Sequence, residues 1–309
     1  MTVMTKTRTD LPIIQIPTQN GEPSAFSKIA VVGLGLIGCS IALAIKNKWP
    51  QALVIGIDDK TVLEKAMLIY AIDVASDDPM LMTEAALVIL AAPVRENCHV
   101  LASLGDHVVG EAVVTDVGST KRDICEASEQ LLKRLRFVGG HPLGGAPKGG
   151  IENARSDLFS QRPWLFTPTE STCDKSLAKL QTFVAGFGAL PHVMTPAEHD
   201  RMLASLSHLP QLVASTLMHS VGSNVGTHGL GLTGRGLSDT TRLASSPADI
   251  WKDIYASNSD NVGAALNEFI ETLETLRDDL NRGVEIERVF ASAGTWRHAV
   301  LNEREKSQK

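Results

Sequence analysis

The stretch KIAVVGLGLIG, residues 28–38, decides the fold of this chain. Its first part is an apolar, β-branched run at 28–33 that predicts a buried strand, and residues 36–48 predict a helix. Between them lies Gly-x-Gly-x-x-Gly, which binds dinucleotides when it joins a strand to a helix. The first glycine allows the tight turn, the second lets the backbone approach a pyrophosphate, and the third lets the helix pack close to its strand. The phosphates would bind free N–H groups at the helix start, where the expected cofactor contacts are Gly33, Gly35, Leu36, Ile37 and Gly38.

Outward from this turn, short apolar runs alternate with helical stretches as far as residue 195. Further strands are predicted at 53–58, 86–93, 111–118, 136–142, 162–168 and 189–194. Further helices are predicted at 60–70, 122–136 and 171–187. Strands that are apolar throughout are buried on both faces, and their alternation with helices is typical of a parallel sheet. We therefore expect an α/β chain in which residues 28–195 form a doubly wound, Rossmann-type domain that binds the dinucleotide.

The predicted strands stop there, and residues 196–309 are expected to form an all-helical C-terminal domain. Residues 196–222 predict one long helix with a kink at Pro210, because proline has no N–H to donate to the preceding turn. Residues 258–281 predict another helix, with Gly283 as its C-cap. Its apolar residues recur every three or four positions, as in a coiled-coil seam, and they are Val262, Leu266, Phe269, Leu273, Leu276 and Leu280. Such a seam is either buried within the subunit or, as we expect, pairs two copies as a homodimer.

Composition excludes several classes of protein. The chain has 309 residues, 43% of them hydrophobic, and a formal charge of −6, which is ordinary for a globular protein of two domains. No basic stripe is present to bind nucleic acid, and no run of 18 apolar residues could span a membrane. The four cysteines lack metal-ligand spacing, so we expect free thiols, no metal and a cytoplasmic location. The polar segment at 1–27 has no signal peptide and predicts a flexible N-terminal arm.

One acidic residue favours NAD over NADP as the cofactor. Asp58 ends the second predicted strand, 20 residues after Gly38, where a carboxylate accepts hydrogen bonds from ribose hydroxyls and repels a 2′-phosphate. The same side chain could instead cap the helix that follows. Ala92 and Pro93 end a later strand, at the sheet edge where ligands bind, and are expected to line the cofactor.

Several polar clusters follow the cofactor motif. TDVGSTK (115–121) and GGHPLGG (139–145) each come where a predicted strand ends. Because the carboxyl ends of parallel strands share one edge, Ser119 and His141 are expected to meet near the nicotinamide, and Ser119 also to contact the cofactor. SHLP (207–210), DTTRLA (239–244) and IWKDI (250–254) lie in the helical part.

These motifs, in this order, resemble those of the prephenate and arogenate dehydrogenases of tyrosine biosynthesis, over roughly residues 28–300. The resemblance implies oxidative decarboxylation of prephenate to 4-hydroxyphenylpyruvate with reduction of NAD+. It also implies that His141 polarises the ring hydroxyl and accepts its proton, that Ser119 holds the hydroxyl and the histidine in line, and that Arg242 anchors a carboxylate. The alternatives are that Ser119 caps the next helix and that Arg242 pairs with Asp239 at the surface.

The resemblance also implies a substrate cleft between the two domains, with His208, Gln211 and Trp251 around the substrate. Each has a structural alternative, since a buried histidine or tryptophan can simply belong to the core. Many prephenate-specific members have a histidine where this chain has Gln211, and an amide carries no charge at any pH. Arogenate, or both substrates, therefore stays an alternative to prephenate.

Two other hypotheses come from different classes of protein. β-Hydroxyacid dehydrogenases and imine reductases also join a Rossmann domain to a helical domain. The hydroxyacid enzymes carry a catalytic lysine on the first long helix of the second domain, whereas residues 196–222 contain no lysine. A non-catalytic NAD-sensing protein would bind the cofactor without using His141.

Overall fold

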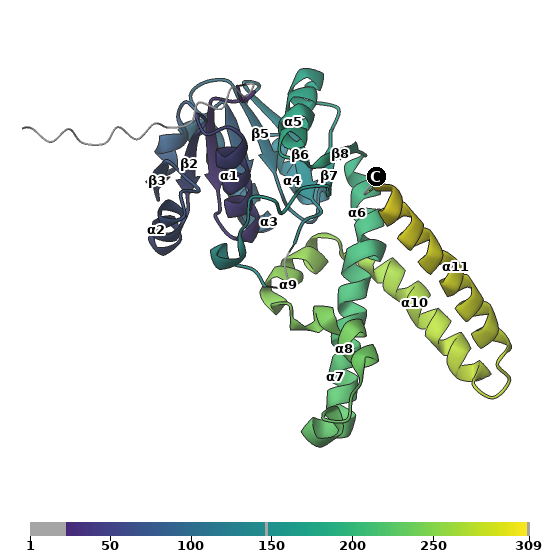
Figure 1. Cartoon of the computed structure of the whole chain (residues 1–309). Coiled ribbons are helices and arrows are strands. Elements are labelled where there is room, and N and C mark those ends of the chain that lie inside the picture. Colours follow the sequence, from purple (N-terminus) through teal and green to yellow (C-terminus); the bar gives the residue numbers. More distant parts are fainter. Residues whose placement is uncertain (1–22, 146–147, 308–309) are drawn as a thin grey trace, which may run out of the picture.

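The computed structural model describes residues 23–145 and 148–307. Figure 1 shows a sheet flanked by helices in the N-terminal half, and long helices that extend away from it in the C-terminal half. Of the expected arm at 1–27, only residues 23–27 lie within the described part. Phe26 in this short segment is buried, with its ring edge-on to Phe183.

Eight strands form one sheet in the order β3-β2-β1-β4-β5-β6-β7-β8. They are β1 (Lys28–Val32), β2 (Leu53–Ile57), β3 (Val74–Ser76), β4 (Leu87–Leu90), β5 (Ala112–Asp116), β6 (Leu135–Pro142), β7 (Pro163–Thr167) and β8 (Leu190–Val193). All neighbours are parallel except β6 and β7. The predicted Rossmann-type sheet is confirmed, but β7 departs from the parallel pattern. A parallel neighbour needs a long crossover, whereas the described part of 143–162 holds only the 3-10 helix η2 (Ile151–Asn153).

Helices cover both faces of the sheet, and one apolar core lies on each face. One face carries α1 (Leu36–Lys48), α2 (Lys60–Leu68) and α5 (Asp174–Gly186), and the other carries α3 (Val94–His107) and α4 (Arg122–Ser128). The sequence analysis missed β3, which has three residues, and α3, whose sequence is largely polar. The helix predicted at 122–136 ends at Ser128, whose hydroxyl donates to the carbonyl of Cys125 (2.6 Å) before the chain turns toward β6.

The C-terminal half is helical, as predicted. Its elements are α6 (Pro196–Leu203), a π-helical turn η3 (Ala204–His208), α7 (Leu209–Leu230), α8 (Arg235–Thr240), the 3-10 helix η4 (Arg242–Ser245), α9 (Ala248–Ser257), α10 (Ser259–Asp279) and α11 (Val284–Ser307). The long helix expected at 196–222 is therefore interrupted before Pro210. Proline has no N–H to donate to the preceding turn, and the wider π-helical turn tolerates this missing hydrogen bond. The helix also continues into the glycine-rich stretch, where Gly226 breaks it locally with φ +60°.

The helices α10 and α11 form a hairpin that projects from the rest of the chain (Figure 1). The helix α10 ends with Leu280 as its C-cap, three residues before the predicted Gly283. Gly283 instead lies in the turn before α11, with φ +81° and its N–H bonded to the carbonyl of Asp279 (2.9 Å). The predicted seam is only partly covered within the subunit: Val262 at its start is buried, Leu266, Phe269 and Leu276 are half-buried, and Leu280 at its end is 69% exposed. No described helix combines the length and the apolar character needed to cross a bilayer.

Candidate active site

The glycine turn between β1 and α1 leaves room for a ligand at one point only. A Cβ on Gly33, which has φ +90°, would lie 2.6 Å from the backbone nitrogen of Ala92, and one on Gly38 would lie 1.9 Å from the carbonyl oxygen of Gly33. A Cβ on Gly35 would meet nothing within 4 Å. The first and third glycines are thus required by packing, while the second borders open space at the N-terminus of α1. This is the arrangement that a pyrophosphate needs.

Asp58 joins the end of β2 to this turn. One carboxylate oxygen accepts a hydrogen bond from the N–H of Leu34 (2.5 Å) and the other from the N–H of Asp59 (2.6 Å). The N-cap position of α2 belongs to Asp59, so the alternative that Asp58 caps that helix is wrong. Asp58 is half-buried and stands at the carboxyl edge of the sheet.

A cavity of about 540 Å³ lies between the sheet and the helical half. Seven of the predicted site residues line it, namely Gly35, Leu36, Ile37, Ala92, Pro93, Ser119 and Trp251. Both halves of the chain contribute to its wall, as expected for a cleft between them. A larger hollow of about 790 Å³ lies over α2 and β3, but its lining holds none of the predicted site residues.

His141 ends β6 with its side chain almost fully buried, at 9% exposure. Its Nδ1 lies 2.9 Å from Nε2 of His199, and Nδ1 of His199 lies 2.8 Å from a carboxylate oxygen of Asp200. Nε2 of His141 bonds no described residue, yet it is not among the enclosed polar atoms. One ring nitrogen is therefore held by the protein, and the other has no partner among the described residues, although His141 is not among the residues that line the cavity of about 540 Å³.

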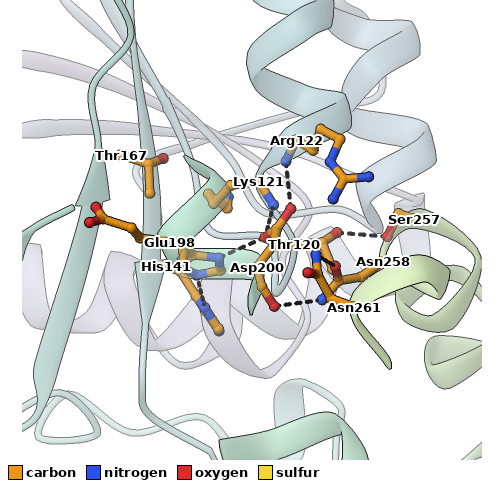
Figure 2. Close-up of polar contacts among 12 residues, drawn as sticks. Thr120, Lys121, Arg122, His141, Thr167, Glu198, Asp200, Ser257, Asn258 and Asn261 are labelled. Atoms are coloured by element: carbon orange, nitrogen blue, oxygen red, sulfur yellow. Dashed lines mark hydrogen bonds and ion pairs between the residues drawn. The ribbon is translucent and has the colours of Figure 1, made fainter. Parts of the chain in front are cut away.

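Asp200 also anchors these side chains to the start of α4 (Figure 2). Its carboxylate accepts hydrogen bonds from the backbone N–H groups of Lys121 (2.8 Å) and Arg122 (2.9 Å) at the start of α4. Its backbone carbonyl accepts one from the side chain of Asn258 (2.8 Å). Asp200 thus joins α6, α4 and the start of α10 at a single point.

A buried ion pair supports the strand end that carries His141. Lys121 and Asp116 are both inaccessible to solvent and form an ion pair. Lys121 also donates to the carbonyl of Gly140 (2.8 Å), while Asp116 accepts from the N–H of the same residue (3.1 Å). The pair therefore fixes the residue directly before His141.

Burial sets the charge of these groups. Burial, followed by the neighbouring charges of His199, Lys121 and His208, holds the pKa of His141 well below its usual range. Burial would raise the pKa of Asp200, but the hydrogen bonds from His199 and from the backbone N–H groups of Arg122 and Lys121 lower it overall. At neutral pH the site therefore holds a neutral His141 and an ionised Asp200, and a neutral imidazole can accept a proton.

The remaining sheet residue, Ser119, lies in the turn after β5 and lines the cavity without a side-chain hydrogen bond to any described residue. The expected contact that holds His141 in line is therefore not formed by Ser119; His199 makes it instead. Ser119 does not cap α4 either, because Lys121 occupies the N-cap.

The predicted residues of the helical half lie at different depths. His208 is fully buried on η3; its Nδ1 lies 3.3 Å from the amide nitrogen of Asn258, and its Nε2 is enclosed without a partner. Burial lowers the pKa of His208 to about 4. Trp251 lies edge-on to His208 and stacks on Tyr255.

Gln211 holds the short helix that carries Arg242, because it bonds the backbone of the next residue, Leu243. The Gln211 amide donates to the carbonyl of Leu243 (2.9 Å) and to the hydroxyl of Ser215 (3.1 Å), which ties α7 to η4. Arg242 begins η4 with an exposed side chain. The alternative that it pairs with Asp239 is wrong, because no ion pair joins these two described residues.

The sequence analysis missed His199, Asp200, Asp116 and Lys121. Two of them stand inside TDVGSTK, which was singled out for its serine. The adjacent His199 and Asp200 follow the N-cap Thr195 on the first turns of α6, and only their burial in the structure distinguishes them from other polar residues of a helix, so no local signal in the sequence indicated them.

Comparison with known proteins identifies the family. A family model for the nucleotide-binding domain of prephenate dehydrogenase matches residues 41–193, and one for its dimerization domain matches 195–290. The prephenate dehydrogenase of Bacillus subtilis is 35% identical over 257 residues, which cover 81% of this chain and 69% of that protein.

Two solved structures are similar throughout. The prephenate dehydrogenase of Aquifex aeolicus, solved with hydroxyphenyl propionate and NAD+, has a TM-score of 0.82 at 27% identity and covers 89% of this chain and 98% of its own. The arogenate dehydrogenase of Synechocystis has a TM-score of 0.75 at 30% identity and covers 88% and 99%. On the shared sequence and the shared architecture, the chain belongs to the prephenate dehydrogenase family.

Proposed function

We propose that this protein is an NAD-dependent prephenate dehydrogenase, which converts prephenate to 4-hydroxyphenylpyruvate and CO2 in tyrosine biosynthesis. The observation that carries the proposal is the neutral His141 at the carboxyl end of β6, whose Nε2 has no partner among the described residues. A proton acceptor is what oxidation of an alcohol requires. The similarity to prephenate dehydrogenases along most of the chain supports this substrate.

The glycine turn fits the dinucleotide. The open space at Gly35 and the N-terminus of α1 would hold the pyrophosphate, with Leu36, Ile37, Ala92 and Pro93 in the same cavity wall. Asp58 would face the ribose hydroxyls, which favours NAD over NADP. When bound, NAD+ supplies a nicotinamide that takes the hydride from the hydroxyl-bearing carbon of the substrate.

His141 and Ser119 would have separate roles in the reaction. His141 accepts the hydroxyl proton at Nε2 while the carbon–oxygen double bond forms, and Ser119 in the cavity wall hydrogen-bonds the same hydroxyl. Loss of CO2 places the electrons of the broken carbon–carbon bond in the ring, and the ring oxygen regains a proton from His141. Aromatisation of the ring drives the reaction.

The helical half would bind the anionic groups of the substrate. The guanidinium of Arg242 has no carboxylate partner among the described residues. A charge-assisted pair between this guanidinium and a substrate carboxylate would fix the orientation of the substrate. The orphaned Nε2 of His208 stands next to Trp251, which lines the cavity. Together with Arg242 and Gln211, these two side chains would bound the substrate side of the cleft, where Trp251 lines the cavity and the others are not among its lining residues.

A homodimer through the helical half completes the proposal. Large apolar side chains of the α10–α11 hairpin remain exposed, including Leu280 at 69%, Phe290 at 71% and Trp296 at 70%. Exposed apolar surface of this kind marks an interface. Sedimentation should show a dimer at micromolar concentration, and a monomer would contradict this part of the proposal.

Arogenate is the second candidate substrate, because Gln211 carries no charge and the similar Synechocystis protein is an arogenate dehydrogenase. NADH formation with prephenate and with arogenate, each tried with NAD+ and NADP+, separates the candidates. We expect prephenate with NAD+ to give the highest kcat/KM. Folded protein that binds NAD+ but oxidises neither substrate would contradict the enzymatic function and favour a cofactor-sensing role.

A further inference from the structure

We infer that His199 and Asp200 are positioning residues that hold His141 in the one tautomer able to accept a proton from substrate. The inference rests on the proposed function, since it concerns the base of that reaction. It starts from three side chains in a row, His141, His199 and Asp200, joined by contacts of 2.9 and 2.8 Å. Each contact fixes the position of one hydrogen.

The first hydrogen is fixed by Asp200. Its carboxylate accepts hydrogen bonds from the backbone N–H groups of Lys121 and Arg122, and such bonds stabilise the ionised form. An ionised carboxylate can only accept. Nδ1 of His199, which lies 2.8 Å from Asp200, must therefore carry the hydrogen in this bond.

The second hydrogen follows from the first. In a neutral imidazole one ring nitrogen donates and the other accepts, so Nε2 of His199 is an acceptor. The 2.9 Å contact then requires Nδ1 of His141 to be the donor. Nε2 of His141 is left as a lone pair, and it is the nitrogen that has no partner among the described residues.

The opposite tautomer would disable the site. With the hydrogen on Nε2, His141 would present a donor to the substrate hydroxyl and could take no proton from it. The same bonds also help after proton transfer, because the imidazolium then donates a charge-assisted bond to His199. The charge is compensated by Asp200 behind His199, as in other acid–histidine pairs that orient a base.

The arrangement also couples the two halves of the chain. His141 belongs to the sheet, whereas His199 and Asp200 belong to α6, the first helix of the C-terminal half. The base therefore becomes competent only when α6 is docked on the sheet. Thr120 and Ser257, whose hydroxyls lie 2.8 Å apart, join the two halves beside the site (Figure 2).

The direct test is the ¹⁵N spectrum of histidine-labelled protein without substrate or cofactor, at neutral pH. Nitrogen shifts distinguish a protonated from an unprotonated ring nitrogen. We expect both His141 and His199 to carry their hydrogen on Nδ1. A wild-type His141 with its hydrogen on Nε2, or a doubly protonated one, overturns the inference without reference to any activity.

Two substitutions at position 199 extend the test to catalysis. His199→Leu removes the acceptor, so we expect Nε2–H of His141 to become populated and kcat for prephenate to fall by ~10²-fold or more, with KM within about threefold. His199→Gln can offer its amide oxygen to His141, and we expect it to restore kcat to within about tenfold of wild type.

The matched control is His192→Leu, the same change at an exposed histidine on β8, which should leave kcat and the His141 tautomer unchanged. An undiminished kcat in His199→Leu, or a loss in His199→Gln as large as in His199→Leu, overturns the inference. If the wild type itself oxidises no prephenate, the proposed function fails, and the spectrum still decides the tautomer.

Discussion

The two walls of the cleft are built differently. On the sheet side, Asp116, Lys121 and His141 are buried, and hydrogen bonds and an ion pair hold their side chains in place. On the helical side, Arg242 is exposed, and the orphaned Nε2 of His208 has no protein partner. Under the proposed function, the sheet side is preorganised for proton transfer, while the exposed Arg242 on the helical side is available for an anionic ligand. Substitutions on the two sides should therefore change different kinetic constants.

The largest effect is expected on the sheet side. His141→Asn keeps a polar side chain but removes the proton acceptor, so kcat should fall by ~10²–10⁴-fold while substrate affinity changes by less than about tenfold. Steady-state NADH formation with prephenate measures both constants. Equal losses in kcat and in affinity would instead give His141 a role in binding, and the contrast between the two walls would disappear.

The buried ion pair should matter for stability rather than for substrate binding. Lys121→Met leaves the Asp116 carboxylate buried without its partner, and we expect the free energy of unfolding to fall by ~3–5 kcal/mol. Denaturant titration measures this loss. Lys252→Met, which breaks the exposed pair with Asp249, is the matched control and should cost less than ~1 kcal/mol. Similar losses in the two variants would show that the sheet side is not held by this pair.

On the helical side, His208 should make the protein sensitive to acid. Its pKa is about 4 in the folded chain, against a usual value of 6.5. Between these two pH values the unfolded chain binds a proton that the folded chain does not, so stability falls as the pH drops from 6.5 toward 4, by about 3 kcal/mol from this residue. His208→Gln should remove this share of the acid sensitivity in thermal melts at several pH values. The exposed His219→Gln should keep it, and equal acid sensitivity in wild type and His208→Gln would speak against the prediction.

The smallest effect concerns the exposed guanidinium. Arg242→Gln should raise KM for prephenate by about 10–100-fold, as expected for loss of a charge-assisted hydrogen bond of ~1.5–3 kcal/mol, with little change in kcat. Initial rates over a range of prephenate concentrations test this, with Arg235→Gln, another exposed arginine, as the control. A fall in kcat at unchanged KM would place Arg242 in the chemical step and reverse its assignment to the binding wall.

Local patterns in the chain were sufficient for much of the architecture. The boundaries of α1 (36–48) agree with the structure, and most strands agree within a few residues, because apolar periodicity and glycine turns are properties of neighbouring residues. The direction of β7 and the wide turn before Pro210 were not predictable in this way. Both depend on how the chain packs after it leaves an element, which no short window of sequence contains.

The same division applies to the site. The glycine turn and Asp58 could be predicted from a motif and its spacing, because these encode the backbone shape and the chemistry that a dinucleotide requires, and His141 could be predicted from the resemblance to the family. The partnership of His141 with His199 and Asp200 could not, because 58 residues separate the two histidines and nothing local indicates that α6 docks on the end of β6. Which nitrogen of His141 carries the hydrogen is a consequence of that contact. The choice of His141 as the proposed base thus follows from the order of residues, and the protonation state that we infer for it follows from the packing of one half of the chain against the other.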